Sequence, residues 1–420
     1  MRFIYNIFIF VYRLGIGITA IFNAKASLWV KGRKSVLKRI AKAVNPGENI
    51  IWFHCASLGE FEQGRPIIER IKSSHPEIKI FLTFFSPSGY EIRKNYKSAD
   101  YIFYLPYDSP RNAKRLVEIV KPQMAIFVKY EFWFNYFIQL KKNSIPLYLV
   151  SGVFRKDQHF FKSWAYWQRN QLKNFDYFFL QDENSASLLT SIGFNNNMVT
   201  GDTRFDRVSE IVDEKIDLPI IEKFKSGKSV LCAGSSWPPD EDIILDYLNS
   251  RTSESTKDLK LIIAPHDIST KHLDELLKKF KNYKPLLYSK LKPNSEKLAG
   301  SKILIINSIG LLNKLYRFAD IAYIGGGFGV AIHNLLEPAV YGIPVIYGPN
   351  HKNFREAIEL AESQGGFPIN NKVDFKNIMN KLLSDKDFYE MYATAAGEYI
   401  SKNTGSSDMV LKKLELDYRG

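Results

Sequence analysis

The feature that most constrains the fold is a regular alternation of short apolar runs with amphipathic stretches, which occurs twice along the 420 residues. The expected strands of the first occurrence are residues 49–55, 78–85, 101–105, 124–128, 147–150 and 177–180, with helices at 64–72 and 88–96. The pattern restarts at 229–234 and continues at 259–264, 302–307, 321–324 and near 346. Buried strands that alternate with helices predict α/β folding with a doubly wound parallel sheet in each half.

The length and the repeated pattern together indicate two domains. A chain of 420 residues exceeds what one core usually carries, and 45% hydrophobic residues suffice for two. The charged stretch 201–218 is a plausible linker. We expect a membrane-anchoring segment at 1–30 and two Rossmann-like domains at 31–212 and 213–420, which face a cleft at the carboxyl ends of their strands.

The stretch 323–350 is the strongest candidate for a ligand site. Its apolar strand breaks at glycines, including Gly326 and Gly327, and we expect a helix to begin near His333. Backbone N–H groups at such a turn bind phosphate, and Asn334 and Glu337 would share one helix face beside it. The glycines alone are equally consistent with a turn that only packs a helix on a sheet.

Other expected strand ends also carry polar residues. Glu60 follows the first strand, where it is either a general base or a carboxylate that compensates a helix dipole. The acidic run 240–242 fits a helix N-terminus better than a metal site. Further polar or strand-end residues are Ser235, Ser236, Pro265, His266 and the stretch 307–310.

The N-terminal segment 3–23 is apolar and aromatic and is followed by many lysines and arginines, which is typical of a membrane anchor with a cytoplasmic body. Arg13 interrupts it at a cost of about 2.5–3.5 kcal/mol for spanning, so spanning and in-plane binding both remain open. A cleaved signal peptide is a weaker alternative.

The net charge of +14 favours a polyanionic partner, whether nucleic acid, anionic membrane or phosphorylated substrate. Cys55 and Cys232 lie in separate apolar runs and are expected to be buried thiols.

Motifs over nearly the whole chain resemble the 3-deoxy-D-manno-octulosonic acid (Kdo) transferase family of lipopolysaccharide synthesis. The stretch 28–34 is similar to that family's opening, and residues 57–60 match its S-x-G-E motif. Residues 130–135 match E-x-E-x-W-P-N in part, and residues 201–206 resemble G-N-x-K-F-D. Residues 234–236 resemble G-S-T, and 333–339 are close to G-H-N-x-L-E-P-A.

The resemblance implies a GT-B glycosyltransferase at the cytoplasmic side of the bacterial inner membrane, with 31–212 as its acceptor domain and 213–420 as its nucleotide-sugar domain. It would transfer Kdo from CMP-Kdo to a phosphorylated lipid A precursor, with no metal, no cofactor and no nucleic-acid partner. Glu60 matches the family's catalytic base. The residues expected to bind CMP-Kdo are Ser235, Ser236, Pro265, His266, Ser308, Ile309, Gly310, Gly326, Gly327, Asn334, Leu335, Leu336 and Glu337.

The chain departs from the family pattern at several positions. His266 stands where the family usually has arginine, Lys129 and Tyr130 occupy the region of the first glutamate, and Phe134 replaces proline. Two other interpretations remain: another nucleotide-sugar enzyme, such as a UDP-sugar transferase or 2-epimerase, and a non-catalytic membrane-bound binder of lipid or polyanion. The second would not need Glu60.

Overall fold

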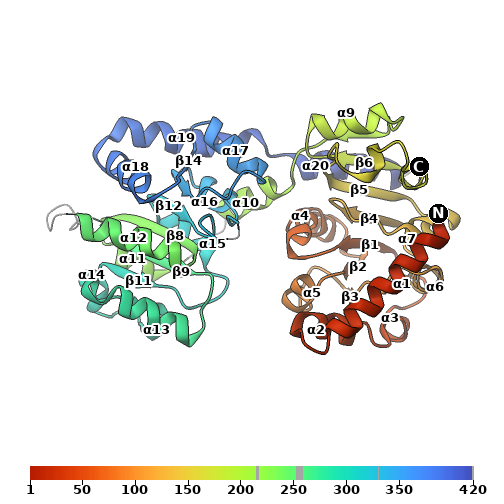
Figure 1. The fold of residues 1–420 in the computed structure, drawn as a ribbon, viewed down its shortest axis with the longest axis horizontal. Helices are drawn as coiled ribbons and strands as arrows, with labels where there is room; N and C mark the ends of the chain where they lie inside the picture. Colours follow the sequence, from red (N-terminus) through yellow and green to blue (C-terminus); the bar gives the residue numbers. More distant parts are fainter. Residues whose placement is uncertain (214–216, 252–258, 330, 419–420) are drawn as a thin grey trace. The chain divides into compact units, whose positions relative to one another are not determined.

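The computed structural model describes residues 1–213, 217–251, 259–329 and 331–418, which form two compact units. Unit 1 comprises Met1–Arg207 and Thr404–Gly420, and unit 2 comprises Val208–Asn403. The expected division placed 404–420 in the second domain, whereas α20 (Ser406–Tyr418) packs on unit 1 (Figure 1). The Asp206 carboxylate of unit 1 holds the start of this C-terminal segment, because it accepts hydrogen bonds from the backbone N–H groups of Gly405 and Ser407, each at 2.6 Å.

Unit 1 is built on a parallel seven-stranded sheet in the order β3-β2-β1-β4-β5-β6-β7. Its strands are β1 (Ile50–Cys55), β2 (Lys79–Phe84), β3 (Tyr101–Tyr104), β4 (Met124–Val128), β5 (Leu147–Gly152), β6 (Tyr177–Leu180) and β7 (Asn197–Val199). Its helices are α1 (Arg2–Thr19), α2 (Ala24–Arg33), α3 (Val36–Ala43), α4 (Leu58–Ser74), α5 (Pro87–Arg93), α6 (Pro110–Val120), α7 (Phe134–Lys142), α8 (Tyr166–Gln171) and α9 (Glu183–Ser191). Two 3-10 turns, η1 (His159–Phe161) and η2 (Leu172–Asn174), flank α8. Helices pack both faces of the sheet, which buries its central strands completely (Figure 1).

Unit 2 repeats the architecture with a parallel sheet in the order β10-β11-β9-β8-β12-β13-β14. The strands are β8 (Ser229–Ser236), β9 (Leu259–Pro265), β10 (Leu286–Leu287), β11 (Ile303–Ile305), β12 (Ile321–Ile324), β13 (Val345–Tyr347) and β14 (Gly366–Pro368). The helices are α10 (Arg204–Asp213), which begins in unit 1, α11 (Pro219–Lys225), α12 (Pro238–Ser250), α13 (Thr270–Lys279), α14 (Lys297–Gly300), α15 (Leu312–Leu315), α16 (Leu336–Ala339), α17 (Arg355–Glu362), α18 (Lys372–Ser384) and α19 (Lys386–Lys402). The 3-10 turns are η3 (Lys281–Tyr283), η4 (Tyr288–Lys290) and η5 (Tyr316–Phe318).

The strand orders locate the expected ligand positions. In each sheet the next strands along the chain all lie on one side of the first strand, and the later strands lie on its other side. The strand order therefore reverses between β1 and β4 and between β8 and β12, which are the switch points. Ligands of open α/β sheets bind at the carboxyl ends of the strands at such points. The loops after β1, β4, β8 and β12 are therefore the expected ligand positions.

The expected doubly wound α/β fold is confirmed, with differences in detail. Helix α4 begins at Leu58, earlier than expected, because Ser57 and Glu60 form a cap ahead of the apolar face. The expected linker 201–218 contains α10, whose Phe205 and Val208 are buried. The edge strands β7 and β14 were not anticipated, since three residues carry too little pattern. Cys55 and Cys232 are buried free thiols, as expected.

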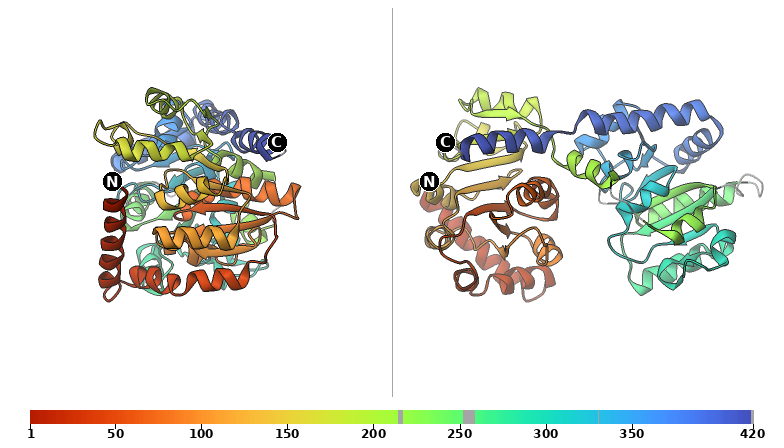
Figure 2. Two further views of the ribbon diagram at one scale, coloured as in Figure 1. Left: turned by 90° about the vertical axis from the view of Figure 1, so that its right-hand side faces the viewer. Right: turned by 180° about the vertical axis from the view of Figure 1, so that it is seen from behind.

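Helix α1 runs along the outside of unit 1 (Figure 2). The Tyr5 hydroxyl donates to the buried Asp108 carboxylate at 2.6 Å, and the Arg2 guanidinium donates to Asn135 at 3.2 Å. Farther along, Arg13 donates to the Tyr107 hydroxyl at 3.2 Å. These polar contacts hold one side of the helix against the unit. Ile9 is the helix residue buried in the packing, whereas most of its large apolar side chains face outward.

Arg33 ties the N-terminal helices to the sheet. Its guanidinium is buried, donates to the carbonyl oxygens of Leu105 at 2.8 Å and Phe85 at 2.7 Å, and lies 3.8 Å from the Trp29 ring centroid. Burial lowers the pKa of this guanidinium to about 9, so it remains charged at neutral pH. A cation over an aromatic ring is stabilised further by the ring's electrons.

We predict that Arg33→Met lowers the free energy of unfolding by about 3 kcal/mol, because two buried carbonyl groups lose their charged donor. Urea denaturation of the purified protein measures this change. Lys34→Met is the matched control, since Lys34 is exposed at the end of the same helix, and a change within about 0.5 kcal/mol is expected there. An equal effect of both substitutions would contradict the role of Arg33.

Candidate functional site

Glu60 lies in the first turn of α4, directly after β1. Its side chain is 8% exposed, and its Oε2 accepts the backbone N–H of Ser57 at 3.0 Å and also the Ser57 hydroxyl. In this capping box a carboxylate satisfies an N–H group that the helix start leaves unpaired. The general-base role of Glu60 remains a prediction, and it requires the other oxygen, Oε1, to reach an acceptor hydroxyl.

A polar and aromatic network joins the ends of β1 and β4 in unit 1. The Trp133 indole N–H donates to Glu131 Oε2 at 2.9 Å and to His54 Nε2 at 3.1 Å. His54 is fully buried, and its Nδ1 lies 3.0 Å from the Thr83 hydroxyl. The Phe85 ring stacks on Trp133 with 4.7 Å between centroids. Sequence reasoning did not single out His54 or Trp133 as site residues, although the 130–135 motif pointed to this loop.

In unit 2, three rings from three loops meet at the carboxyl ends of β8, β9 and β12. Trp237 and His266 stack with 4.5 Å between centroids, and His266 lies 4.8 Å from His333. The Trp237 indole N–H donates to His333 Nε2 at 3.4 Å. His266 was expected here, whereas Trp237 and His333 were missed. Stacked aromatic rings with an exposed member, here His266, can stack a planar base.

Asp240 organises the glycine turn that follows β12. Its side chain is 1% exposed, and its carboxylate accepts the backbone N–H groups of Gly326 and Trp237, both at 2.9 Å, and the Tyr323 hydroxyl at 2.6 Å. Burial raises the pKa of this carboxyl, although the three donors favour its charged form. The Gly326 N–H thus already has a protein partner, so it does not serve a phosphate in this conformation.

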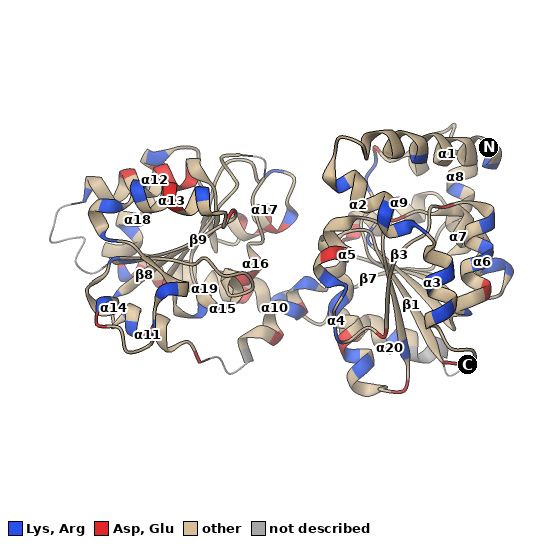
Figure 3. Ribbon diagram, turned by 90° about the horizontal axis from the view of Figure 1, so that it is seen from below, with Lys and Arg blue, Asp and Glu red and all other residues tan. Residues whose placement is uncertain are grey.

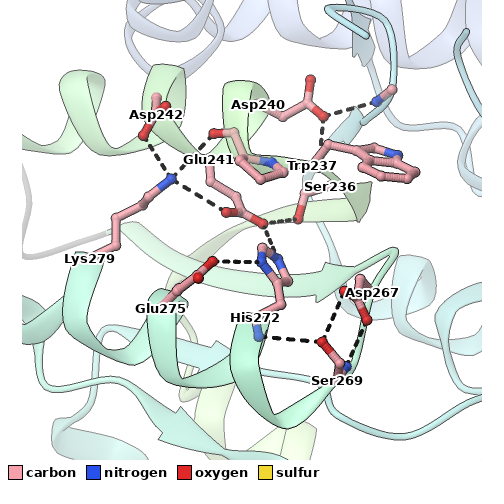
Figure 4. A network of polar contacts seen from close by, with 12 residues as sticks. Ser236, Trp237, Asp240, Glu241, Asp242, Asp267, Ser269, His272, Glu275 and Lys279 are labelled. Atoms are coloured by element: carbon pink, nitrogen blue, oxygen red, sulfur yellow. Dashed lines mark hydrogen bonds and ion pairs between the residues drawn. The ribbon is translucent and has the colours of Figure 1, made fainter. Parts of the chain in front are cut away.

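The neighbouring Glu241 belongs to a second network within unit 2 (Figure 4). It is 1% exposed, accepts the Ser236 hydroxyl at 3.3 Å and contacts His272 Nε2 at 3.0 Å. Lys279 lies 3.5 Å from Glu241 and 2.7 Å from the exposed Asp242. The acidic run therefore starts α12, as expected, and its carboxylates hold protein groups. Among the residues that the structure describes, no cluster of three or more His, Cys, Asp or Glu is placed to bind a metal ion.

The loop between β12 and α16 differs from expectation. The helix begins at Leu336 and not near His333, because the Asn334 side-chain oxygen accepts the Leu336 N–H at 3.1 Å and forms a turn ahead of the short helix. The Asn334 amide donates to Glu337 at 3.1 Å, so these two residues do lie together, as expected. Gly327 packs so closely on Gly348 that a Cβ would approach its Cα to 2.6 Å. Close backbone packing thus accounts for this glycine, and the helix starts three residues later than expected, while phosphate binding by this turn stays a prediction.

The remaining predicted donor residues lie at the same edge of the unit 2 sheet. Ser235 and Ser236 end β8, and Pro265 ends β9. The Ser236 hydroxyl is engaged by Glu241, which leaves Ser235, with its left-handed backbone at φ 51°, as the serine nearer the solvent. Leu335 and Leu336 are buried and contribute packing. Ser308, Ile309 and Gly310 follow β11, which neighbours β9 on the side away from β8.

His333 is expected to remain neutral across the physiological range. Burial, together with nearby His266, lowers its pKa from 6.5 to about 4. Between about pH 4 and pH 6.5 the His333 imidazole is protonated in the unfolded chain but not in the folded chain. This residue therefore lowers the free energy of unfolding as the pH falls from about 6.5 to about 4. NMR titration of the imidazole nitrogens should give a midpoint near 4. In His266→Ala the midpoint should rise but stay below 6.5, since burial is the larger cause; an unchanged midpoint would exclude coupling to His266.

Comparison with known proteins agrees with the sequence motifs. Residues 31–207 match the family model described as 3-deoxy-D-manno-octulosonic-acid transferase (kdotransferase). The chain is 29% identical over 359 residues to 3-deoxy-D-manno-octulosonic acid transferase of Aquifex aeolicus, covering 84% of this chain and 91% of that protein. It is 26% identical over 374 residues to the Haemophilus influenzae protein of the same name, covering 87% and 86%.

Solved structures show the same fold at low identity. A putative UDP-N-acetylglucosamine 2-epimerase from Listeria monocytogenes superposes with a TM-score of 0.60 at 13% identity, covering 89% of this chain and 97% of that chain. UDP-GlcNAc 2-epimerase from Neisseria meningitidis gives a TM-score of 0.59 at 15% identity, covering 87% and 99%. These likenesses concern the fold alone.

Two Rossmann-type units, each with a switch point in its parallel sheet, define the GT-B fold class. Within that class, unit 1 carries the Kdo transferase family domain, and the chain is a homologue of curated Kdo transferases over most of its length. The family resemblance drawn from the motifs is confirmed.

Proposed function

We propose that this protein is a glycosyltransferase that moves Kdo from CMP-Kdo to a phosphorylated lipid A precursor in lipopolysaccharide core assembly. The observation that carries the proposal is similarity to Kdo transferases over 84% of the chain, together with the family domain at residues 31–207. The charge of +14 supports a phosphorylated acceptor.

In this proposal unit 2 binds the donor. The exposed His266 ring, stacked on Trp237, offers a flat surface for the cytosine base. The neutral His333 accepts the Trp237 N–H at Nε2, so its own proton is on Nδ1 and is available to a donor oxygen. Asp240 contributes indirectly, because it fixes the loop that carries His333.

Unit 1 binds the acceptor in this proposal, and Glu60 is its general base. The Glu60 carboxylate takes the proton of the acceptor hydroxyl as that oxygen forms its bond to the anomeric carbon of Kdo and CMP departs with the electron pair of the broken bond. The Ser57 N–H binds Oε2 of this carboxylate, and this contact also orients the other oxygen, Oε1, relative to β1. General-base catalysis of this kind contributes roughly 10²–10⁴ in rate.

The membrane relationship is also part of the proposal. Helix α1 is long and apolar enough to cross a bilayer, with a mean hydropathy of 1.2. Its contacts through Tyr5 and Arg2 with unit 1 favour an in-plane position, with apolar side chains such as Phe3 and Phe10 toward the lipid. Figure 3 shows α1 almost free of charge, while α3 and α6 of the same unit carry several cations that suit an anionic cytoplasmic leaflet.

The test is incubation of the detergent-solubilised protein with CMP-Kdo and a tetraacylated lipid A precursor, followed by measurement of CMP release and of the lipid's mass. A mass gain in units of Kdo supports the proposal and gives the number of residues transferred. CMP release without lipid gain would point to a different acceptor. If neither CMP release nor a mass gain is observed, Kdo transfer is rejected.

The alternative is a UDP-sugar transferase or 2-epimerase, since the solved epimerase structures have the same fold as this chain. Binding measurements distinguish the two. The proposed enzyme should bind CMP more tightly than UDP, whereas the alternative reverses this order. Sequence similarity to Kdo transferases over most of the chain ranks the alternative second.

A further inference from the structure

A large apolar pocket lies in unit 1 between α1 and the loops after β4 and β5. Its volume is about 770 Å³, within the range of pockets that bind small organic ligands. The wall formed by α1 consists of Met1, Ile4, Tyr5 and Phe8, and the facing wall includes Phe132, Phe134, Phe160 and Trp167. Phe132 and Phe160 pack against each other at 4.7 Å, so this wall is anchored in the core.

Cations lie at one side of this pocket. Tyr130 lines it, and the Lys129 ammonium and the Arg155 guanidinium lie 5.2 Å and 5.6 Å from the Tyr130 ring centroid. Arg155 also contacts Asp157, a pocket residue, at 3.7 Å, and both side chains are largely exposed. An apolar cavity with two cations beside it is complementary to a molecule that has an alkyl chain and a phosphate.

The pocket connects to other features of unit 1. On one side, Ile4 and Phe8 are 59% and 63% exposed and continue into the outward apolar surface of α1. On the other, Tyr130 precedes Glu131, whose carboxylate accepts the Trp133 N–H that also reaches His54 of β1. The β4–α7 loop thus leads from the pocket to the switch point where β1 ends.

We infer that this pocket receives one acyl chain of the glycolipid acceptor, with Lys129 and Arg155 contacting an acceptor phosphate. The inference rests on the proposed function and deepens it, since a bilayer-embedded acceptor would otherwise keep all of its chains in the lipid. A chain that leaves the bilayer and enters the pocket positions the sugar headgroup over unit 1. Burying alkyl groups there also favours acylated over deacylated acceptors.

Filling the pocket tests the inference. Ile4→Trp places a large ring in the cavity, and because Ile4 is largely exposed the change should not disturb folding. Ile18→Trp is the matched control: it is the same substitution in the same helix, 66% exposed, and about 21 Å along the axis. We expect kcat/KM for the tetraacylated acceptor to fall about tenfold in Ile4→Trp, the effect of excluding roughly two methylene groups, and to change less than twofold in Ile18→Trp.

The fully deacylated acceptor is the second arm. Its kcat/KM should be equal in the wild type and both variants, because it has no chain to place in the pocket. Equal losses for both acceptors in Ile4→Trp, or equal losses in the two variants, would overturn the inference. Thermal denaturation of each variant shows whether a loss comes from unfolding.

A binding measurement separates failure of the pocket from failure of the proposed function. An acceptor with a photoreactive diazirine in one acyl chain is irradiated with the wild-type protein, and the labelled peptides are identified by mass spectrometry. Labels on the pocket segments 1–8, 130–134 or 157–168 that unlabelled acceptor displaces, and phosphatidylglycerol does not, support the inference even if no Kdo transfer is found. Labels elsewhere, or equal displacement by phosphatidylglycerol, would overturn it and indicate a general lipid contact.

Discussion

Replacing Glu60 by Gln is expected to lower kcat for Kdo transfer by about 10³-fold while the affinity for CMP-Kdo changes little. Gln cannot accept the acceptor proton, which explains the loss. It can still accept the Ser57 N–H, because Gln serves a capping box as Glu does, so α4 should remain folded. Steady-state kinetics with donor titration, and donor binding by calorimetry, measure the two quantities.

Glu62→Gln is the matched control, since Glu62 lies on the same helix and makes partly exposed contacts with Arg65 and Arg93. Activity within about twofold of the wild type is expected. Retained activity in Glu60→Gln would assign Glu60 to helix capping alone and would favour a non-catalytic lipid or polyanion binder. Equal loss of donor binding would mean that the substitution acts on the structure and not on proton transfer.

Replacing Asp240 by Ala is expected to lower the free energy of unfolding by about 4 kcal/mol. The substitution leaves the buried donors of Gly326, Trp237 and Tyr323 without their carboxylate. Because the glycine turn and Trp237 both depend on this group, CMP affinity should fall as well, by about tenfold or more. Urea denaturation and calorimetric titration with CMP measure the two effects.

Asp242→Ala provides the comparison within the same acidic run. Asp242 is 67% exposed and forms an ion pair with Lys279, so a change within about 0.5 kcal/mol is expected. Equal destabilisation by the two substitutions would show that the charge of the first α12 turn matters and not the contacts of Asp240. Unchanged CMP affinity in a folded Asp240→Ala protein would remove the glycine turn from the proposed donor site.

The sheets were predictable because they are buried on both faces. A central parallel strand such as β1 or β9 must be apolar along its length, so its sequence stands out without knowledge of its partners. Strand β7 has three half-buried residues and gives no such signal. The return of α20 to unit 1 depends on Asp206, which is distant in sequence from the N–H groups that it binds, and no local pattern reports that contact.

The candidate site was predictable to a smaller degree. The motifs placed Glu60, His266, Asn334 and Glu337 at strand ends, because loops after parallel strands share one edge of the sheet. The start of α16 was predicted wrongly, because the Asn334 side chain binds the Leu336 N–H in a turn, so the helix does not extend back to His333. The glycines of 325–327 suggested phosphate binding. The Gly326 N–H is bound by Asp240, however, and Gly327 is required by its close packing against Gly348.

The sequence by itself determined the two-unit α/β fold, the loops proposed to carry the chemistry and the family resemblance, since these depend on periodicity and on short motifs. Only the tertiary structure decided which side chains already have partners. Asp240 binds the glycine turn, Trp133 joins Glu131 to His54, and α1 forms one wall of an apolar pocket. Hydrogen bonds and packing join residues that are remote along the chain, so these contacts follow from how the strands and loops are placed and not from local sequence.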